Sequence, residues 1–262
     1  MITAVVFDYG GVISSPLFVG IGDFEAAEGY PRGSLLRLLF GNVGYVGVEG
    51  RAVAASMGAH GSGSSPDASA LRAASIASDP DAAEASGEVL DEPDWHLLEK
   101  GRIDFATYFE RITDRAPAVL GKPLDAEAYG RFMRASAPGV HWMVVHKIRE
   151  LQTRGLRLGL LTNNIKEFGD HWRATFPIDE LFEEVVDSSH VGMRKPDREI
   201  YELMCSRMAI TPDETIFVDD NLDNVAAART YGMEGVHFGD DPWRALAEVD
   251  AILDRRGVPA RR

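Results

Sequence analysis

Residues 4–12 have the sequence Ala4-Val5-Val6-Phe7-Asp8-Tyr9-Gly10-Gly11-Val12. The four apolar residues predict a short buried strand, and the two glycines that follow allow the backbone to turn sharply. In open α/β sheets, ligands bind beyond the carboxyl ends of the strands, so a carboxylate at that position faces a crevice. Asp8 is therefore a candidate nucleophile, although a strand followed by Asp-x-Gly-Gly is also an ordinary way to make a turn.

The composition is that of an acidic globular chain. Its 262 residues are 45% hydrophobic, which is enough for a sizeable core. The formal net charge of −14 argues against nucleic acid or an anionic membrane as a partner, because both would be repelled. The single cysteine excludes an internal disulfide and favours a reducing, cytoplasmic location. No apolar run approaches the roughly 20 residues that span a bilayer, and no pattern indicates an oligomeric state.

From residue 138 onward, short apolar runs alternate with helical patterns. Strands are predicted at 156–161, 184–186, 215–218 and 235–238, and helices at 142–153, 168–175, 198–208 and 223–231. Such alternation is typical of a parallel sheet covered by helices on both faces. The opening strand must join this sheet, because it would otherwise have no partner. The predicted fold is therefore α/β, with a doubly wound parallel sheet of the Rossmann-like kind.

The region between the first strand and the rest of this sheet has helical apolar spacing instead, at 33–40, 105–120 and 126–135. We interpret residues 14–137 as an inserted helical cap, and residues 1–13 with 138–262 as the core. Within the cap, residues 52–88 are dominated by Ala, Ser and Gly, which cannot bury enough apolar surface to offset the entropy of ordering. We interpret them as a mobile surface insertion, with a functional lid as the alternative.

Polar residues follow the predicted strands, and the carboxyl ends of parallel strands share one edge of a sheet. Residues 162–164, Thr-Asn-Asn, would either bind phosphate oxygens through hydroxyl and N–H groups or form a polar turn. Lys195 precedes Pro196, which restricts its backbone. Its ammonium group is either held in a fixed orientation toward the site or solvated at the surface. Residues 219–223 hold three carboxylates, so either water screens them or a hard cation lies among them.

Taken together, four segments resemble the four motifs of the haloacid dehalogenase superfamily in the right order. They are Asp8-Tyr9-Gly10-Gly11-Val12, Leu161-Thr162-Asn163-Asn164, Lys195-Pro196 and Val218-Asp219-Asp220-Asn221-Leu222-Asp223-Asn224. The helical segment between the first two resembles the α-helical cap of subfamily I. Within the superfamily, the chain is most similar to sugar-phosphate phosphatases of the glucose-1-phosphatase kind and to the amino-terminal phosphatase domain of soluble epoxide hydrolases.

This resemblance implies a phosphatase that acts on a small phosphorylated metabolite, such as a sugar phosphate. Asp8 would attack phosphorus and form an aspartyl-phosphate, which water then hydrolyses. Thr162 and the Asn163 amide would hold phosphate oxygens. Lys195 would neutralise charge on both Asp8 and the phosphoryl group. Nucleophile, phosphate binder and cation would thus come from three separate strand ends.

The same resemblance implies a Mg²⁺ site. Asp8, Asp220 and the backbone carbonyl of Gly10 would bind the ion, while Asp219 and Asn224 would lie beside it without binding it directly. Phosphoryl transfer depends chiefly on positioning and on charge stabilisation, so a cation and a lysine around one carboxylate supply what the reaction needs. The acidic character of the chain is then compatible with an anionic substrate.

Gly10 departs from the pattern of most phosphatases in the superfamily, which carry a second Asp there as general acid. Losing such an acid typically costs about 10²- to 10⁴-fold in rate. The glucose-1-phosphatase-like members resemble this chain in having Gly at that position. Three explanations stay open: a leaving group that needs little protonation, an acid supplied by the cap, or a non-catalytic protein that keeps the fold for binding.

A 2-haloacid dehalogenase is the close alternative, because those enzymes also lack the second Asp and use no metal. Their fourth motif resembles Ser-Ser-Asn, whereas this chain has Asp219-Asp220-Asn221. Two carboxylates facing Asp8 without a cation would be hard to tolerate, which favours the phosphatase. The cap adds no decodable substrate pattern, and we expect His96, beside Trp95, to be a packed cap residue and not an acid.

Overall fold

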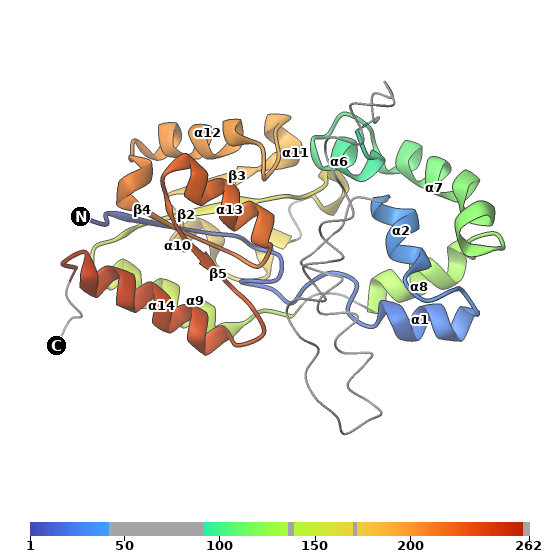
Figure 1. The fold of residues 1–262 in the computed structure, drawn as a ribbon, viewed down its shortest axis with the longest axis horizontal. Coiled ribbons are helices and arrows are strands. Elements are labelled where there is room, and N and C mark those ends of the chain that lie inside the picture. The colour runs from blue at the N-terminus through green and yellow to red at the C-terminus, as the bar shows by residue number, and fades with distance from the viewer. Residues whose placement is uncertain (42–91, 136–138, 170–171, 259–262) are drawn as a thin grey trace.

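The computed structural model describes residues 1–41, 92–135, 139–169 and 172–258. The insertion predicted at 52–88 lies outside these residues. Figure 1 shows two parts side by side: a sheet with helices above and below it, and a group of helices at the other end of the molecule. The amino terminus lies at the end of the sheet that is remote from the helical group.

Five parallel strands form one sheet with the order β3-β2-β1-β4-β5. The strands are β1 (Ala4–Phe7), β2 (Arg157–Thr162), β3 (Glu184–Asp187), β4 (Thr215–Asp219) and β5 (Glu234–His237). β1 is central, and Phe7 is in register with Leu160 on one side and Val218 on the other. The prediction that the opening strand joins the later sheet is confirmed. Asp8 consequently lies at the middle of the carboxyl edge.

Successive residues of β1 point to opposite faces of the sheet, and both faces are covered. The helices of this part are α9 (Trp142–Thr153), α10 (Ile178–Leu181), α11 (Ser188–Val191), α12 (Arg198–Met208), α13 (Leu222–Tyr231) and α14 (Pro242–Arg255). Val5 and Phe7 belong to an apolar core with α9, α10 and α14, while Ala4 and Val6 belong to a second core with α12 and α13. Figure 1 shows these two sets of helices on opposite sides of the strands. The doubly wound α/β fold is therefore confirmed.

The helix predicted at 168–175 is wrong. The described residues there form two separate 3₁₀ turns, η1 (Lys166–Phe168) and η2 (Trp172–Ala174). Gly169 ends the first turn with φ of +52°, a left-handed conformation that glycine adopts without strain. A third 3₁₀ turn, η3 (Pro212–Glu214), leads into β4.

The inserted helices pack around an apolar cluster of their own. They are α1 (Ile21–Glu28), α2 (Ser34–Phe40), α6 (Asp94–Glu99), α7 (Phe105–Leu120) and α8 (Ala126–Ala135). Trp95, Tyr108 and Ile112 are buried in this cluster, and Ile165 joins it from the loop after β2. These helices thus have a core of their own, and the domain boundaries, with the cap inserted after residue 13, stay a proposal from the sequence.

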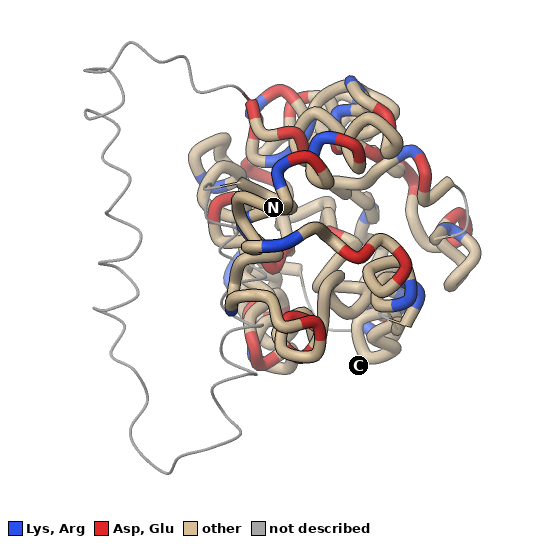
Figure 2. Tube along the Cα trace, turned by 90° about the vertical axis from the view of Figure 1, so that its right-hand side faces the viewer, with Lys and Arg blue, Asp and Glu red and all other residues tan. Residues whose placement is uncertain are grey.

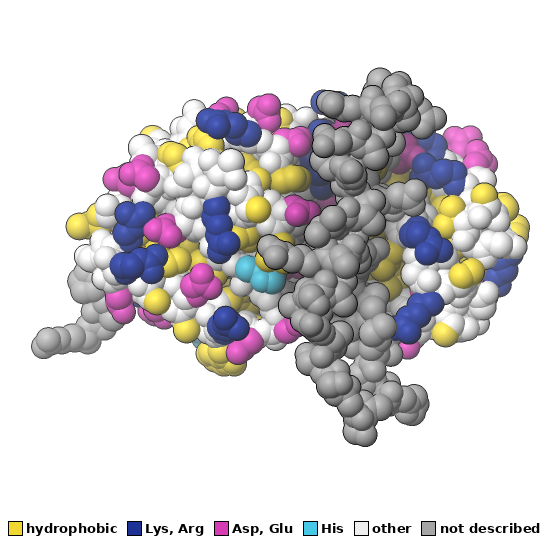
Figure 3. Space-filling view, viewed as in Figure 1, with side chains coloured by type: hydrophobic (Ala, Val, Ile, Leu, Met, Phe, Trp, Pro, Cys, Tyr) yellow, Lys and Arg dark blue, Asp and Glu magenta, His cyan; other side chains and the backbone are white. Residues whose placement is uncertain are grey.

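Charged residues of both signs are interspersed along the described trace of the chain (Figure 2). On the face seen in Figure 3, basic and acidic side chains are likewise scattered over both parts. No helix among the described residues is long and apolar enough to cross a membrane.

Candidate active site

The ends of β1, β2 and β4 place three predicted site residues together. The backbone N–H of Asp8 donates to the carbonyl of Val218 on β4 (2.9 Å), so Asp8 continues the edge of β1 before the chain turns. Thr162 ends β2 on one side, and Asp219 ends β4 on the other. Asp8, Thr162 and Asp219 are all buried. Residues more than 200 positions apart in the chain thus meet at one edge.

Lys195 is the central cation of this group and is 1% exposed. Its Nζ lies 2.7 Å from Oδ1 of Asp8 and 2.7 Å from Oδ2 of Asp219, and it donates to the carbonyl of Leu161 at 2.9 Å. The Asn163 side chain fixes the lysine backbone from both sides, because Nδ2 donates to the Lys195 carbonyl and Oδ1 accepts from the Lys195 N–H. The ammonium is therefore held at a defined point between two carboxylates.

Asp219 is wholly buried, and hydrogen bonds surround its carboxylate. Oδ1 accepts from the Asn221 backbone N–H at 2.8 Å, and Asn224 Nδ2 lies 3.0 Å and 3.2 Å from the two oxygens. Asn221 also caps α13, since its side chain accepts from the N–H groups of the first turn. Because Asp219 is occupied by Lys195 and Asn224, it is suited to holding the lysine and not to binding a metal directly.

Burial and neighbouring charges shift the ionisation of this cluster. Burial raises the pKa of Asp8 well above its ordinary value; the Lys195 ammonium opposes this shift, and the carboxylates of Asp219 and Asp220 reinforce it. Burial alone would lower the pKa of Lys195, but Asp219 and Asp8 together raise it above its usual value. Lys195 therefore stays charged, and a second cation would favour the ionised form of Asp8.

The acidic cluster fits a divalent cation. Asp8, Asp219 and Asp220 each offer one carboxylate oxygen, and these atoms lie within 4.8 Å of one another. One ammonium cannot neutralise three carboxylates, and the excess negative charge is costly where two of them are buried. Hard oxygen ligands suit Mg²⁺. Because Asp219 already forms an ion pair with Lys195, Asp8 and Asp220 are the acids best placed to bind such an ion.

Residues at the end of β2 and just after it differ in whether their polar groups are already hydrogen-bonded within the protein. Thr162 is 3% exposed, and among the described residues its hydroxyl makes one long contact, of 3.4 Å, with the Asn163 carbonyl. Asn164, in contrast, is bound on both sides: its N–H contacts Ser188 Oγ and its side chain donates to Asp187, both at 2.9 Å. The Thr162 hydroxyl is thus the side chain of this segment best placed for a phosphate oxygen.

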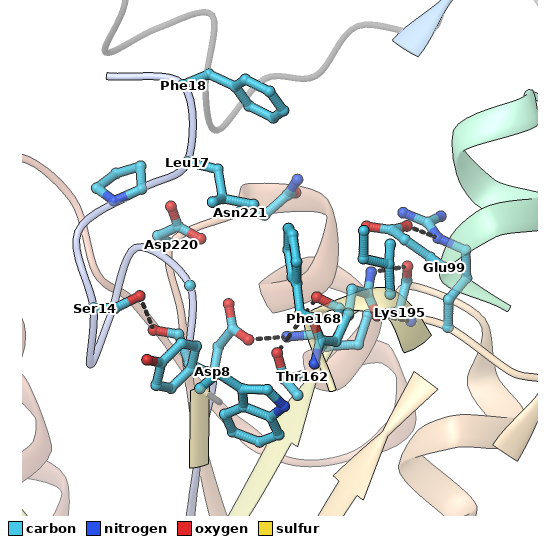
Figure 4. Close-up of a pocket in the computed structure, with 18 of the residues that line it drawn as sticks. Asp8, Ser14, Leu17, Phe18, Glu99, Thr162, Phe168, Lys195, Asp220 and Asn221 are labelled. Atoms are coloured by element: carbon cyan, nitrogen blue, oxygen red, sulfur yellow. Dashed lines mark hydrogen bonds and ion pairs between the residues drawn. The ribbon is translucent and has the colours of Figure 1, made fainter. Parts of the chain in front are cut away.

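A cavity of about 370 Å³ opens above these residues. Its floor contains Asp8, Thr162, Lys195 and Asp220, and Figure 4 shows that these side chains converge. They come from the ends of β1, β2 and β4 and from the loop after α11. Its upper wall includes Leu17 and other apolar residues from the segment after β1, from the cap and from the loop after β2. The size lies in the range of small-molecule sites.

Sequence reasoning missed an ion pair that joins cap and core beside this cavity. Arg194 Nε lies 2.6 Å from Oε2 of Glu99, and both residues are more than nine-tenths buried and line the cavity. Arg194 precedes the predicted Lys195, which is a weak signal, whereas nothing in the sequence marks Glu99. His96 does not line the cavity, and burial lowers its pKa to about 4. His96 is therefore neutral near pH 7 and unsuited as a general acid.

These features agree with a match between residues 2–232 and the family model of haloacid dehalogenase-like hydrolases. The chain belongs to this hydrolase family, and the resemblance predicted from the four motifs is confirmed. A HAD family enzyme of Bacteroides thetaiotaomicron, solved with magnesium and inorganic phosphate, matches with a TM-score of 0.51 and 19% identity over 90% of this chain and 94% of that one. Solved dehalogenases have similar TM-scores of 0.54 and 0.55, so the fold alone does not separate the two activities.

Phosphatases are among its curated relatives. A sesquiterpene phosphatase of Aspergillus oryzae is 29% identical over 164 residues, which cover 59% of this chain and 76% of that protein. A phosphoglycolate phosphatase of Salmonella paratyphi A is 31% identical over 115 residues, which cover 42% of this chain and 46% of that protein. The match to the second relative thus spans less than half of its length.

Proposed function

We propose that this protein is a Mg²⁺-dependent phosphatase that hydrolyses a small phosphomonoester through a phosphorylated Asp8. The observation that carries the proposal is the position of Asp8, 2.7 Å from the Lys195 ammonium and within the acidic cluster at the cavity floor. A carboxylate between two positive charges can approach a phosphoryl group that would otherwise repel it. The phosphatases among its relatives support this chemistry.

The proposed reaction has two displacements at phosphorus. A carboxylate oxygen of Asp8 forms a bond to phosphorus while the ester P–O bond breaks, and the alkoxide leaves and takes up a proton from the solvent. Water then attacks the phosphorus of the aspartyl-phosphate, releasing inorganic phosphate and restoring Asp8. Lys195 balances charge on Asp8 and on the phosphoryl oxygens. The Thr162 hydroxyl and the backbone N–H of Asn163 hold the remaining phosphoryl oxygens.

The proposed ligands of Mg²⁺ are Asp8, Asp220 and the Gly10 carbonyl. When bound, the ion would neutralise phosphoryl charge and keep Asp8 ionised. Asp219 and Asn224 do not bind the ion themselves. Asp219 forms an ion pair with the Lys195 ammonium, and the side chain of Asn224 donates a hydrogen bond to Asp219. This division leaves each carboxylate of the cluster with a partner of opposite charge.

A 2-haloacid dehalogenase remains the alternative activity, and a non-catalytic binding protein the alternative class. The Asp219–Asp220 pair favours the phosphatase, because a metal-free site would leave Asp220 and Asp8 close together with a single ammonium. The binding protein is favoured by Gly10, which provides no general acid. Among the phosphatases it resembles, one is named for sesquiterpenes and another for phosphoglycolate, so the relatives leave the alcohol part of the substrate open.

The test is hydrolysis of p-nitrophenyl phosphate with Mg²⁺, without Mg²⁺, and by the Asp8→Asn variant. The proposal requires turnover that depends on Mg²⁺ and disappears with Asp8→Asn. Asp114→Asn, a substitution in the cap away from the cavity lining, serves as a matched control and should retain activity. Halide release from 2-haloacids would select the dehalogenase, and no turnover of a broad phosphate panel would favour the binding protein.

A further inference from the structure

The walls and the floor of the active-site cavity differ in chemical character. The floor carries the carboxylates, the lysine and the hydroxyl described above. The walls are mostly apolar, and their large side chains are Leu17, Phe18, Trp95, Met133, Phe168 and Trp172. Figure 4 shows Leu17 and Phe18 on the side of the cavity away from Asp8. A phosphate held on the floor would therefore place its alcohol among aromatic and aliphatic groups.

The polar groups of the described walls are mostly bonded to one another. Tyr9 Oη is 3.1 Å from Thr175 Oγ1, which itself donates to a backbone carbonyl. Arg194 is paired through Nε with Oε2 of Glu99 at 2.6 Å. Burial raises the pKa of the Glu99 carboxylate, and the buried indole N–H of Trp95 acts on that carboxylate to lower it. These walls offer few partners to the hydroxyls of a sugar, and unpaired polar groups bind poorly in a desolvated site.

We infer that the substrate is the phosphate ester of an apolar alcohol, with an alkyl, prenyl or aryl group in the upper cavity. The inference rests on the proposed function and narrows it. It differs from the sugar phosphate that the sequence resemblance implies. The charged floor binds the phosphate, and burial of the apolar group against Phe18, Met133 and Phe168 supplies binding energy that a sugar could not obtain there.

The first test is a series of n-alkyl phosphates from ethyl to octyl, assayed with Mg²⁺ beside glucose 1-phosphate and glucose 6-phosphate. We expect kcat/KM to rise by roughly fourfold per methylene until the cavity is filled, as expected for burial of apolar surface. We also expect octyl phosphate to exceed both sugar phosphates. A flat series, or preference for a sugar phosphate, would overturn the inference.

Two further measurements separate this inference from the proposed function. Mg²⁺-dependent hydrolysis of p-nitrophenyl phosphate that Asp8→Asn abolishes supports the phosphatase whatever the alkyl series shows. If no ester is hydrolysed, calorimetric binding of octylphosphonate and of glucose 1-phosphate in the presence of Mg²⁺ decides the character of the cavity. Tighter binding of octylphosphonate supports the apolar site, and equal or weaker binding overturns it.

Neighbouring residues of α8 provide a matched pair of variants. Met133 lines the cavity, whereas Phe132 lies on another surface of the cap, and both are half-buried against the same cap core. Met133→Ser should lower kcat/KM for octyl phosphate, mainly through KM, by about tenfold more than it lowers kcat/KM for ethyl phosphate. Phe132→Ser should leave the octyl-to-ethyl ratio as it is in the unmodified protein. Equal effects of both variants on that ratio would contradict the inference.

Discussion

Gly11 lies directly against the carboxylate of Asp220: a Cβ at Gly11 would be 2.0 Å from Asp220 Oδ2. The backbone of Gly11 also has φ of +79°, a conformation that residues other than glycine rarely adopt. The glycine after the first strand therefore does more than allow a turn. It leaves the space in which Asp220 points toward the proposed metal position.

Gly11→Ala should accordingly weaken Mg²⁺ binding. The added methyl group must displace the Asp220 carboxylate, and the left-handed backbone costs about a further 1–2 kcal/mol. We expect a loss of Mg²⁺ affinity of at least tenfold, measured by calorimetric titration or by the Mg²⁺ dependence of the rate. Gly121→Ala is the control, because Gly121 has φ of +78° and open space around it. Mg²⁺ affinity that is unchanged in Gly11→Ala would exclude Asp220 as a ligand.

Gly10, one residue earlier, has the opposite environment. A Cβ there would meet nothing within 4 Å, and Gly10 is not among the residues with positive φ. Gly10→Asp should therefore be accommodated and restore the general acid that most phosphatases of the superfamily carry. We expect kcat for an alkyl phosphate, whose leaving group needs a proton, to rise at least about tenfold, within the range that general acids contribute. Hydrolysis of p-nitrophenyl phosphate should change little, because its leaving group is stable without a proton.

The matched control for this variant is Gly10→Asn, which has the same shape but cannot donate the proton as an acid. Equal rates for the Asp and Asn variants on the alkyl phosphate would show that the site does not use an acid at this position. The absence of an acid at Gly10 would then be explained by an acid from the cap or by a leaving group that needs little protonation.

The convergence of the site was predictable because it follows from topology. Parallel strands place their carboxyl ends at one edge, so Asp8, Thr162 and Asp219 had to meet once the strands were recognised. Lys195 was found only as a residue after the third strand, and its contact with both carboxylates depends on the loop that Asn163 holds. That contact is a tertiary feature, and only the family resemblance anticipated it.

What the sequence did not reveal depends on packing between distant segments. Glu99 and Arg194 are paired because α6 of the cap docks on the loop after α11, and no local pattern encodes that meeting. The helix expected at 168–175 failed for a local reason, since Gly169 interrupts it. α14 was also missed, although Asp241 before Pro242 is a helix-start signal, and its side chain accepts from the first-turn N–H groups.

The raised pKa of Asp8 predicts that the stabilising effect of Mg²⁺ depends on pH. Burial raises the folded-state pKa above the unfolded value, so the contribution of Asp8 to stability is largest at low pH and is lost as the pH rises through the folded-state pKa. Mg²⁺ requires the ionised carboxylate and offsets this loss. The increase in Tm on adding Mg²⁺ should therefore grow as the pH rises from below to above the raised pKa of Asp8.

Thermal unfolding with Mg²⁺ and with a chelator, at several pH values, measures this effect. Asp8→Asn removes the titrating group, so the Mg²⁺-dependent increase in Tm should become smaller and less dependent on pH in that variant. An increase that is the same at all pH values in the unmodified protein would contradict an Asp8–metal contact.

The Glu99–Arg194 pair predicts a large stability effect at the junction of cap and core. Both side chains are more than nine-tenths buried, and the same end of α6 is also held by Ser188, whose hydroxyl donates to the Glu99 carbonyl at 2.7 Å. Glu99→Gln leaves the arginine charge buried without a carboxylate, which should cost about 3–5 kcal/mol in the free energy of unfolding. KM should rise as well, because the pair lines the cavity.

Denaturant unfolding measures this loss of stability, and two further variants test whether it comes from the buried charge. Arg115→Gln removes an ion pair with Asp94 at a half-exposed position, and it should cost less than about 1 kcal/mol. Replacing both buried partners, with Glu99→Met and Arg194→Met together, removes the uncompensated charge and should recover most of the stability that Glu99→Gln loses. If the double variant is as unstable as Glu99→Gln, the loss comes from packing of α6 and not from the buried charge, and the electrostatic account of the junction is wrong.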